Sequence, residues 1–502
     1  MKKALASCGL ACIFTGMLLL TPGCGSGPAA PVRTMEGRPA IYPDYEGVTI
    51  PPDIAPLDFS LEGSEGSGGA SLEITGSEGG FTVRAKRSGL FSIPRRKWRR
   101  MLASSQGDSL RLTVRISTPE GWKSYEPFFM HVAAEPCESH LAYRLIAPGY
   151  GLWNRMGIYQ RNLRNYSQTP VYENFLTGNN CVNCHSFPSR NPSRMVFHMR
   201  AQYGGTVFID GKRIEKLDTK TDSTISALVY PFWHPSGKFI AFSVNKTSQA
   251  FHSNDPNRLE VFDSESDVVV YDVTRKEVFS SPLLRRKEAF ETFPTFSPDG
   301  KSLFFCSAKA VEKMPEGYRQ AHYSLCRIAF DPETKNFSGK VDTLFAAGDS
   351  LSASFPRVSP DGRYLVFTRH AYGNFSIWHR DSDLWCIRLD DGQMWPLEAA
   401  NSDDVDSYHS WSGNSRWLVF SSRRDDGLYT RPYIACIRPD GRACKPFMLP
   451  QKDPVRYYGS LFCSFNIPEF ISGPVKVNRH RIAGKMKKDK GTPLTFRTSP
   501  PG

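Results

Sequence analysis

Three kinds of pattern are missing from this chain of 502 residues, and each absence excludes a class of protein. After residue 23, no apolar run reaches the ~20 residues that a membrane-spanning helix needs. No G-x-S-x-G elbow marks a serine hydrolase of the α/β kind. No phosphate-binding loop and no glycine-rich dinucleotide fingerprint is present. The chain is therefore not expected to be a polytopic membrane protein, a hydrolase of that kind or a nucleotide-binding enzyme.

An even set of cysteines is also missing. Of the 12 cysteines, Cys8 and Cys12 lie in the N-terminal leader, and Cys24, Cys181 and Cys184 belong to motifs discussed below. The remaining seven are Cys137, Cys306, Cys326, Cys386, Cys436, Cys444 and Cys463. An odd number argues against a fully paired disulfide framework, and a chain this long buries a core without one. Most are predicted to be small core residues, with a disulfide between Cys436 and Cys444 left open.

The N-terminus has the pattern of an export signal. Lys2 and Lys3 precede a short apolar run that ends at a small residue, Gly23, directly before Cys24. The segment resembles a bacterial lipoprotein signal, which implies that residues 1–23 are removed and that Cys24 is lipidated. Residues 24–40 are predicted to be a flexible tether. Ordinary secretion, with Cys24 as a spare thiol, is the alternative.

The motif Cys181-Val182-Asn183-Cys184-His185 is the attachment pattern of a c-type haem. Two thiols bond the porphyrin, and the adjacent imidazole becomes the proximal ligand of the iron. Export supports this interpretation, because haem c is attached outside the bacterial inner membrane. A disulfide, or a zinc site that also uses His198, remains the competing hypothesis.

The distal side of such a haem has two main candidates. Met195 and His198 follow the motif closely, and in a strand they point to opposite faces. The choice between these two ligands stays open, and an iron with water as its distal ligand is a further alternative. No helical stretch follows His185, so the haem is expected to lie between a β domain and the preceding segment rather than in a helical cytochrome domain.

Four segments of the chain repeat one another. They are residues 232–242, 293–305, 355–367 and 408–420. Each has a turn of the Pro-Asp-Gly kind followed by apolar β-formers, and another strand pair follows most of them. Four strands per repeat predict the blades of a β-propeller. Asp299 and Asp361 are predicted to accept backbone hydrogen bonds within their own turns.

The repeats resemble the WD40-like (PD40) blades of the TolB family, in which F-x-x-x-S-P-D-G-K/R marks each blade. The match is good for the two central repeats and weaker at Ser236 and Ser415, which replace Asp and Gly. The resemblance implies a propeller over residues 191–472, with six blades favoured and seven as the alternative. It implies no particular activity.

The rest of the chain is divided by composition. Alternating stretches between residues 41 and 138 predict a β-sandwich-like domain, so the expected fold class is all-β. Residues 139–190 are predicted to connect the domains and to carry the haem motif. The tail, 473–502, has eight Lys or Arg against one Asp and is predicted to be disordered.

The charge is positive, +13 overall, and gathers in the tail and in residues 95–100. For an exported protein, anionic lipid, a glycan or an acidic redox partner is a more plausible contact than nucleic acid. The expected protein is a lipid-anchored haem c carrier of the cell envelope, at the outer membrane facing the periplasm, which transfers electrons with the propeller as docking scaffold. The alternative is a propeller that binds an envelope protein or a glycan, with haem structural or absent. No catalytic residue is identified, so an enzyme is not the favoured hypothesis.

Overall fold

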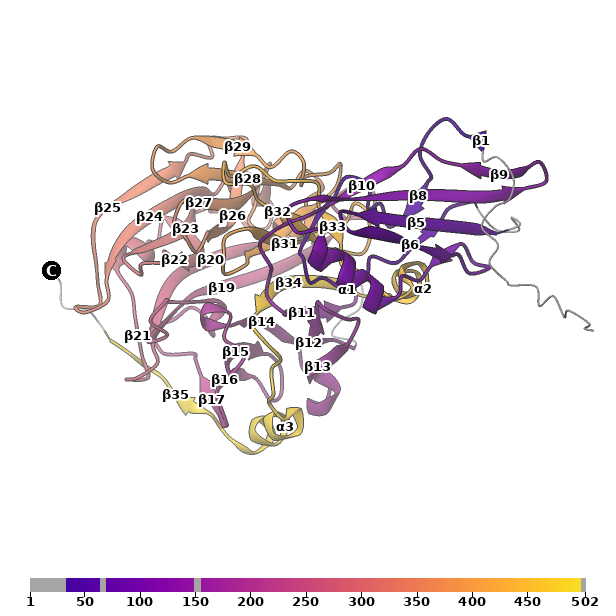
Figure 1. Cartoon of the computed structure of the whole chain (residues 1–502). Coiled ribbons are helices and arrows are strands. Elements are labelled where there is room, and N and C mark those ends of the chain that lie inside the picture. The colour runs from indigo at the N-terminus through magenta and orange to yellow at the C-terminus, as the bar shows by residue number, and fades with distance from the viewer. Residues whose placement is uncertain (1–32, 64–68, 149–154, 498–502) are drawn as a thin grey trace, which may run out of the picture.

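The computed structural model describes residues 33–63, 69–148 and 155–497. Its N-terminal part holds two sheets and a helix, drawn in indigo to purple in Figure 1. The larger sheet contains β1 (Arg33–Thr34), β3 (Thr49–Ile50), β5 (Ala70–Gly76), β6 (Gly79–Arg84), β8 (Ser109–Thr118), β9 (Gly121–Ser124) and β10 (Phe128–Val132). The smaller sheet contains β2 (Ile41–Tyr42), β4 (Phe59–Leu61) and β7 (Leu90–Phe91).

The two sheets pack through the alternating apolar side chains that the sequence predicted. Phe59 of the smaller sheet contacts Phe128 of the larger one, with ring centroids 6.0 Å apart. Residues 95–100 lie on helix α1 (Arg95–Ser104), which was not predicted. Trp98 anchors this helix because it is fully buried and its Nε1 donates to the Ile54 carbonyl at 3.1 Å. The predicted sandwich-like domain is thus present, with a helix added.

Six further sheets follow, each of four or five strands. The first contains β11 (His140–Ile146), β12 (Gly157–Asn162), β13 (Gln168–Glu173) and the late strand β34 (Ser464–Ile471). The second contains β14 (Val182–Ser186), β15 (Arg194–Met199), β16 (Gly205–Asp210), β17 (Arg213–Asp218) and β35 (Thr492–Pro493). The third contains β18 (Val229–Trp233), β19 (Phe239–Phe251), β20 (Leu259–Asp272), β21 (Glu277–Phe279) and β36 (Thr495–Phe496).

The last three sheets each use four consecutive strands. They contain β22 (Ala289–Phe296), β23 (Ser302–Lys309), β24 (Ser324–Asp331) and β25 (Asn336–Phe345); β26 (Ser352–Val358), β27 (Tyr364–His370), β28 (Asp383–Arg388) and β29 (Met394–Pro396); and β30 (Asp406–Trp411), β31 (Trp417–Ser422), β32 (Arg431–Cys436) and β33 (Phe447–Met448). Short 3₁₀ turns lie at Asn174–Thr177, Pro188–Arg190, Pro282–Leu284, Tyr318–Gln320 and Ser376–Trp378. Helix α2 (Pro454–Ser460) precedes β34.

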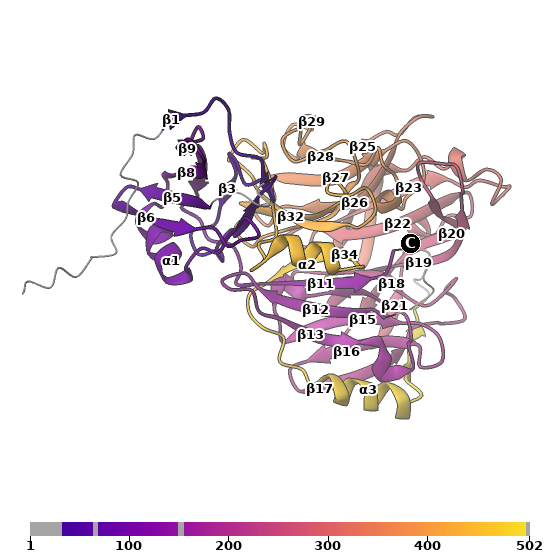
Figure 2. The ribbon, with the colours of Figure 1, turned by 90° about the vertical axis from the view of Figure 1, so that its right-hand side faces the viewer.

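The six sheets form a ring, and the fold is a β-propeller. One edge strand of each sheet contacts the edge strand of the next, in the order β34, β14, β18, β22, β26, β30, and β30 contacts β34 again. Figure 2 shows this body beside the N-terminal domain. The closure joins the two ends of the propeller, because β34 from the end of the chain pairs with β11 from before the haem motif.

The repeat turns have the predicted chemistry. Asp299 accepts from the Lys301 amide at 3.0 Å, and Asp361 accepts from the Arg363 amide at 3.1 Å. Gly300 occupies the turn position with a positive φ of 73°. Ser415 takes the corresponding place in its blade with φ of 60°, which a non-glycine residue adopts at a cost. The predicted backbone hydrogen bonds of Asp299 and Asp361 within their own turns are confirmed.

The prediction of a connecting segment at 139–190 needs correction. Strands β11, β12 and β13 from this segment form three quarters of the first propeller sheet, and β14 is the inner strand of the second. Their fourth partner, β34, lies some 300 residues later in the chain. A local pattern cannot show such a pairing, so the propeller begins at His140 rather than near residue 191.

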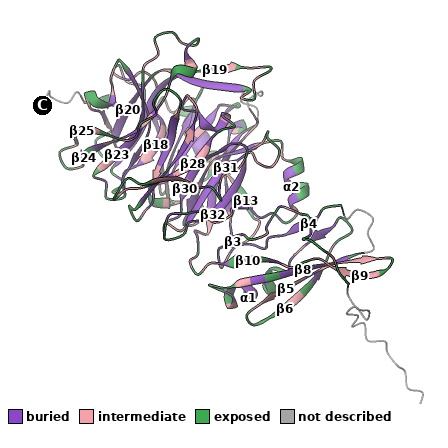
Figure 3. Cartoon of the chain, turned by 90° about the horizontal axis from the view of Figure 1, so that it is seen from above, coloured by how far each residue is buried: buried purple, intermediate pink, exposed green. Residues whose placement is uncertain are grey.

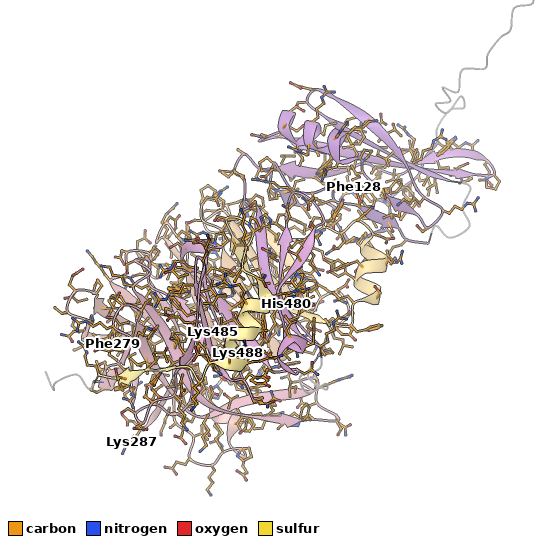
Figure 4. The ribbon with its side chains drawn as sticks, turned by 90° about the horizontal axis from the view of Figure 1, so that it is seen from below. Phe128, Phe279, Lys287, His480, Lys485 and Lys488 are labelled. Atoms are coloured by element: carbon orange, nitrogen blue, oxygen red, sulfur yellow. The ribbon has the colours of Figure 1, made fainter. Side chains whose placement is uncertain are left out.

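The tail at 473–502 was predicted to be disordered, and this too is corrected for the part described. Helix α3 (Arg479–Lys488) buries Ile482, Ala483 and Met486 against the first and second sheets, and Arg479 forms an ion pair with Glu173 of β13, while Lys487 and Lys488 are exposed. Figure 4 labels His480, Lys485 and Lys488 on this helix. Beyond it, β35 pairs with β17 and β36 with β21. Three apolar residues suffice to hold the helix, although the overall composition is polar.

The N-terminal domain packs on the last blade. The Trp417 indole donates to the Glu135 carbonyl at 3.1 Å, and the Tyr42 hydroxyl donates to Asp425 at 3.0 Å. The buried strands, purple in Figure 3, run through both bodies. No helix in the described part of the chain has both the length and the apolar character to cross a membrane. Cys24 and the predicted leader lie outside the described residues.

Candidate functional site

The centre of the propeller is built from six strained residues, one on each inner strand. Every inner strand carries a non-glycine residue with φ between 50° and 53°, at a break in the register with its neighbour. The six are Cys184, Tyr230, Phe293, Phe355, Tyr408 and Ile467. A β-bulge of this kind re-aims a side chain, and here it recurs in every blade. We call these six residues the axial ring.

Five members of the axial ring are bulky. The rings of Phe293 and Phe355 are stacked with centroids 4.0 Å apart, Tyr230 contacts Phe293 at 4.8 Å, and Phe355 contacts Tyr408 at 4.6 Å. Cys184, the second cysteine of the haem motif, is the sixth member and the smallest. The motif therefore occupies the position in the blade repeat at which the other blades place large apolar side chains.

The residue after each ring member also follows a pattern. Four blades have Pro at this position, at 231, 294, 356 and 468, and two have His, at 185 and 409. His185 is 3% exposed and its ring lies against the Ile467 backbone, which leaves at least one ring nitrogen without a hydrogen-bond partner among the described residues. Burial, together with the charge of Arg144, lowers the pKa of His185 to about 3. The imidazole is thus neutral, and its lone pair is available to a ligand.

One cavity of about 290 Å³ lies on the propeller axis beside this histidine. Its wall includes Cys184, His185, His409, Arg357 and Glu469. Burial raises the pKa of Glu469 to about 8, and its Oε1 accepts from the Phe187 amide at 3.1 Å. The His409 Nε2 lies 2.8 Å from the Val366 carbonyl, which fixes that ring. The axial cavity therefore gathers two neutral imidazoles and a carboxyl group that is protonated at neutral pH.

A second cavity, of about 160 Å³, adjoins the first. Tyr230, Tyr408 and Ile467 of the axial ring line both cavities. Cys181 lines only the second, whereas Cys184 and His185 line the first. We call the second one the arginine cavity, because Arg144, Arg200 and Arg423 lie in its wall. The haem motif thus crosses the boundary between two hollow spaces.

The predicted distal ligands lie elsewhere. Met195 and His198 are on β15, the second strand of the sheet, and neither lines the axial cavity. Met195 is fully buried in the core between blades. The His198 Nδ1 lies 3.2 Å from the Thr206 hydroxyl, and burial lowers the pKa of His198 to about 3. Neither residue lines either cavity, so the structure does not bring these two residues to the side of His185.

Sequence reasoning missed His409 and Glu469. A signal for His409 existed: it follows Tyr408 in one repeat as His185 follows Cys184 in another. Glu469 carried no such signal, because its strand closes the ring from the C-terminal end. As for the competing readings of the motif, Cys181 and Cys184 are both free thiols. Among the described residues, no group of three or more His, Cys, Asp or Glu is placed to hold a metal ion.

The residues present fit a covalently bound haem in three respects. Both thiols are unpaired, each reaches a cavity, and the adjacent imidazole has an unpartnered nitrogen. A buried polar atom without a partner is rare in proteins, and the free nitrogen of His185 is suited to a ligand.

No protein-family model matches the chain, and a search of curated proteins gave no match. Solved structures with a partial likeness include oligogalacturonate lyase in complex with manganese, at 13% identity over 62% of this chain and 74% of that one, with a TM-score of 0.36. Kuenenia stuttgartiensis hydrazine synthase gives 12% identity over 50% and 63%, with a TM-score of 0.31. The β-propeller domain of the Trilobed protease from Pyrococcus furiosus gives 10% over 66% and 80%, with a TM-score of 0.31.

Proposed function

We propose that this chain is a c-type haem protein of the bacterial cell envelope, built on a TolB-like propeller, and that it transfers electrons. The observation that carries the proposal is His185, a buried, neutral imidazole with an unpartnered ring nitrogen among the described residues, in a motif with two free thiols. Cys181 and Cys184 would form the thioether bonds, and His185 would be the proximal ligand. A bound haem supplies a centre that takes up and releases one electron.

The chain's own residues would set the conditions at this centre. Three aromatic members of the axial ring, Tyr230, Phe355 and Tyr408, line the cavity beside His185. His409 and Glu469, rather than Met195 or His198, line the same cavity as His185 and are the favoured candidates for the distal side. The positive charge of Arg144 favours the neutral form of His185, since it lowers the pKa of that imidazole.

Location and partners belong to the same proposal. Cys24 would carry the lipid anchor, with the chain at the outer membrane facing the periplasm. An envelope redox protein would dock on the propeller, whose closed ring offers a rigid scaffold. The second candidate is a binding module for an envelope protein or a glycan, without a working haem. The observation that favours it is the arginine cavity, which has a wall suited to a ligand whether or not haem is present.

The test is expression with periplasmic haem-maturation factors. The purified protein is expected to show a Soret band and a haem stain that survives denaturing electrophoresis. Cys181→Ser and Cys184→Ser should each abolish or weaken the covalent attachment, whereas Cys463→Ser, at a half-buried cysteine outside both cavities, should leave it intact. A protein without covalent haem after maturation would refute electron transfer and leave the binding module.

A further inference from the structure

The arginine cavity contains a buried cation without an acidic partner. Arg144 lies on β11 and is 7% exposed. Its Nη1 donates to the Asn183 side chain, and with the Asn466 amide turned so that its oxygen faces Arg144, Nη2 donates to that oxygen at 3.1 Å. Nε has no partner. Both contacts are with neutral amides, so nothing in this set neutralises the charge.

A buried charge of this kind is costly. The free-energy cost of removing a guanidinium from water is offset only when an opposite charge or a full set of hydrogen bonds replaces the water. Within the described ranges, Arg144 and Arg200 form no ion pair. No Asp or Glu is among the described residues that line the cavity. The wall therefore has a strong preference for a negative ligand group.

The wall also has apolar members, beside polar residues such as Thr247 and Gln249. Phe375, Ile377 and Trp378 come from the loop after β27, and Leu259 and Val261 come from β20. The Arg423 guanidinium lies over the Trp378 ring, 4.7 Å from its centroid, which joins the cationic and aromatic parts of the wall. A ligand that fits this wall has a negative group at one end and a flat or apolar body at the other.

We propose that the arginine cavity binds a carboxylate attached to a small apolar or aromatic group. The volume of about 160 Å³ is close to that of an engineered protein cavity, roughly 150 Å³, that accommodates benzene. Arg144 and Arg200 bind the carboxylate, and Trp378 and Phe375 contact the body. The carboxylate has two possible sources: a free organic acid, or a propionate of the haem proposed above.

The experiment uses benzoate as probe and benzamide as its uncharged control. Binding is measured by titration calorimetry on the full chain, in the haem-loaded protein and in the haem-free Cys181→Ala/Cys184→Ala variant. Arg200→Gln is the test variant because Arg200 is exposed, so its loss does not threaten folding. Arg275→Gln, at an exposed arginine outside both cavities, is the matched control.

The haem-free protein is expected to bind benzoate and not benzamide, and Arg200→Gln should weaken benzoate about tenfold, the size of one charge-assisted hydrogen bond. If the haem-loaded protein binds benzoate as tightly as the haem-free protein does, the natural ligand is a free acid. If only the haem-free protein binds benzoate, a haem propionate occupies the cavity in the loaded protein. Either result supports the site. Benzoate binding no better than benzamide in the haem-free protein, or equal affinity in Arg200→Gln and Arg275→Gln, overturns it. Because the haem-free variant decides this test, its outcome does not depend on whether haem is attached.

Discussion

Replacement of Phe355 by alanine and by glycine tests the strain in the axial ring. Phe355 is 3% exposed, has φ of 51° and stacks on Phe293 with ring centroids 4.0 Å apart. Removing a buried Phe side chain costs about 3–5 kcal/mol in the free energy of unfolding. Both variants lose this packing, so the difference between their free energies of unfolding measures the effect of the backbone conformation.

The sign of that difference is the prediction. A left-handed conformation costs an L-residue about 1–2 kcal/mol, and glycine avoids that cost. Glycine in turn destabilises by about 0.5–1 kcal/mol through the larger entropy of its unfolded chain. The balance makes Phe355→Gly more stable than Phe355→Ala by about 0.5–1 kcal/mol.

The control is Phe367, fully buried on β27 of the same blade and not among the residues with positive φ. There the usual order applies, and Phe367→Ala should be more stable than Phe367→Gly by about 0.5–1 kcal/mol. Urea denaturation of the full chain, compared as midpoints at a common slope, measures both differences. If the alanine variant is more stable than the glycine variant at position 355 as well as at position 367, the strain argument is refuted for the whole ring, including Cys184.

Three further predictions concern groups outside that ring. Burial raises the pKa of Glu469 to about 8, above its unfolded value, so the stability that its protonated form contributes is present at low pH and is lost as pH rises from about 4.5 to 8. Urea midpoints measured at pH 5 and pH 8 should show this loss in the unchanged protein and a smaller one in Glu469→Gln. A hydrogen bond from Cys436 lowers the pKa of the Cys444 thiol, so mild oxidation with glutathione disulfide should join this pair, seen by mass spectrometry as a crosslinked peptide that Cys444→Ser lacks. On α1, Arg95 and Arg96 are exposed. Arg95→Gln/Arg96→Gln should weaken binding of the unlipidated chain to vesicles of anionic lipid at least tenfold, from about 1 kcal/mol per charge, and unchanged flotation would show that the helix does not contact the membrane.

The sequence predicted the parts of this fold that depend on local chemistry. The turns at Asp299 and Asp361 need only neighbouring amides, and the alternation in the N-terminal domain marks its buried face. The predictions from the sequence were wrong where segments far apart in the chain pair with each other. The partnership of β11 with β34 leaves no periodic mark, and α3 depends on a few apolar residues within a basic segment.

The site was found only in part for the same reason. The motif was visible as a short pattern, but its coincidence with the blade repeat was not, because Cys184 replaces the bulky apolar residue of the other five blades and His185 replaces the proline of four of them. Met195 was considered because it is near in sequence, whereas His409 is near in space through the ring of inner strands.

Packing alone gives no reason for a cysteine at position 184. The backbone there has φ of 53°, matching the five bulky members of the ring, so blade geometry imposes the strain whatever the side chain. In the other blades, burial of an aromatic or aliphatic side chain stabilises the fold by about 1.5–3 kcal/mol and offsets this backbone strain. This blade buries only a thiol at the same position. At the next position four blades have proline, whose φ is restricted and whose missing N–H needs no partner, whereas this blade has His185 and one other has His409. The cysteine is found in this blade alone among the six, and it lowers stability there. Departures from a local rule without a structural gain are typical of functional sites, and this one supports a ligand at Cys184 and His185 more strongly than the five-residue motif does alone.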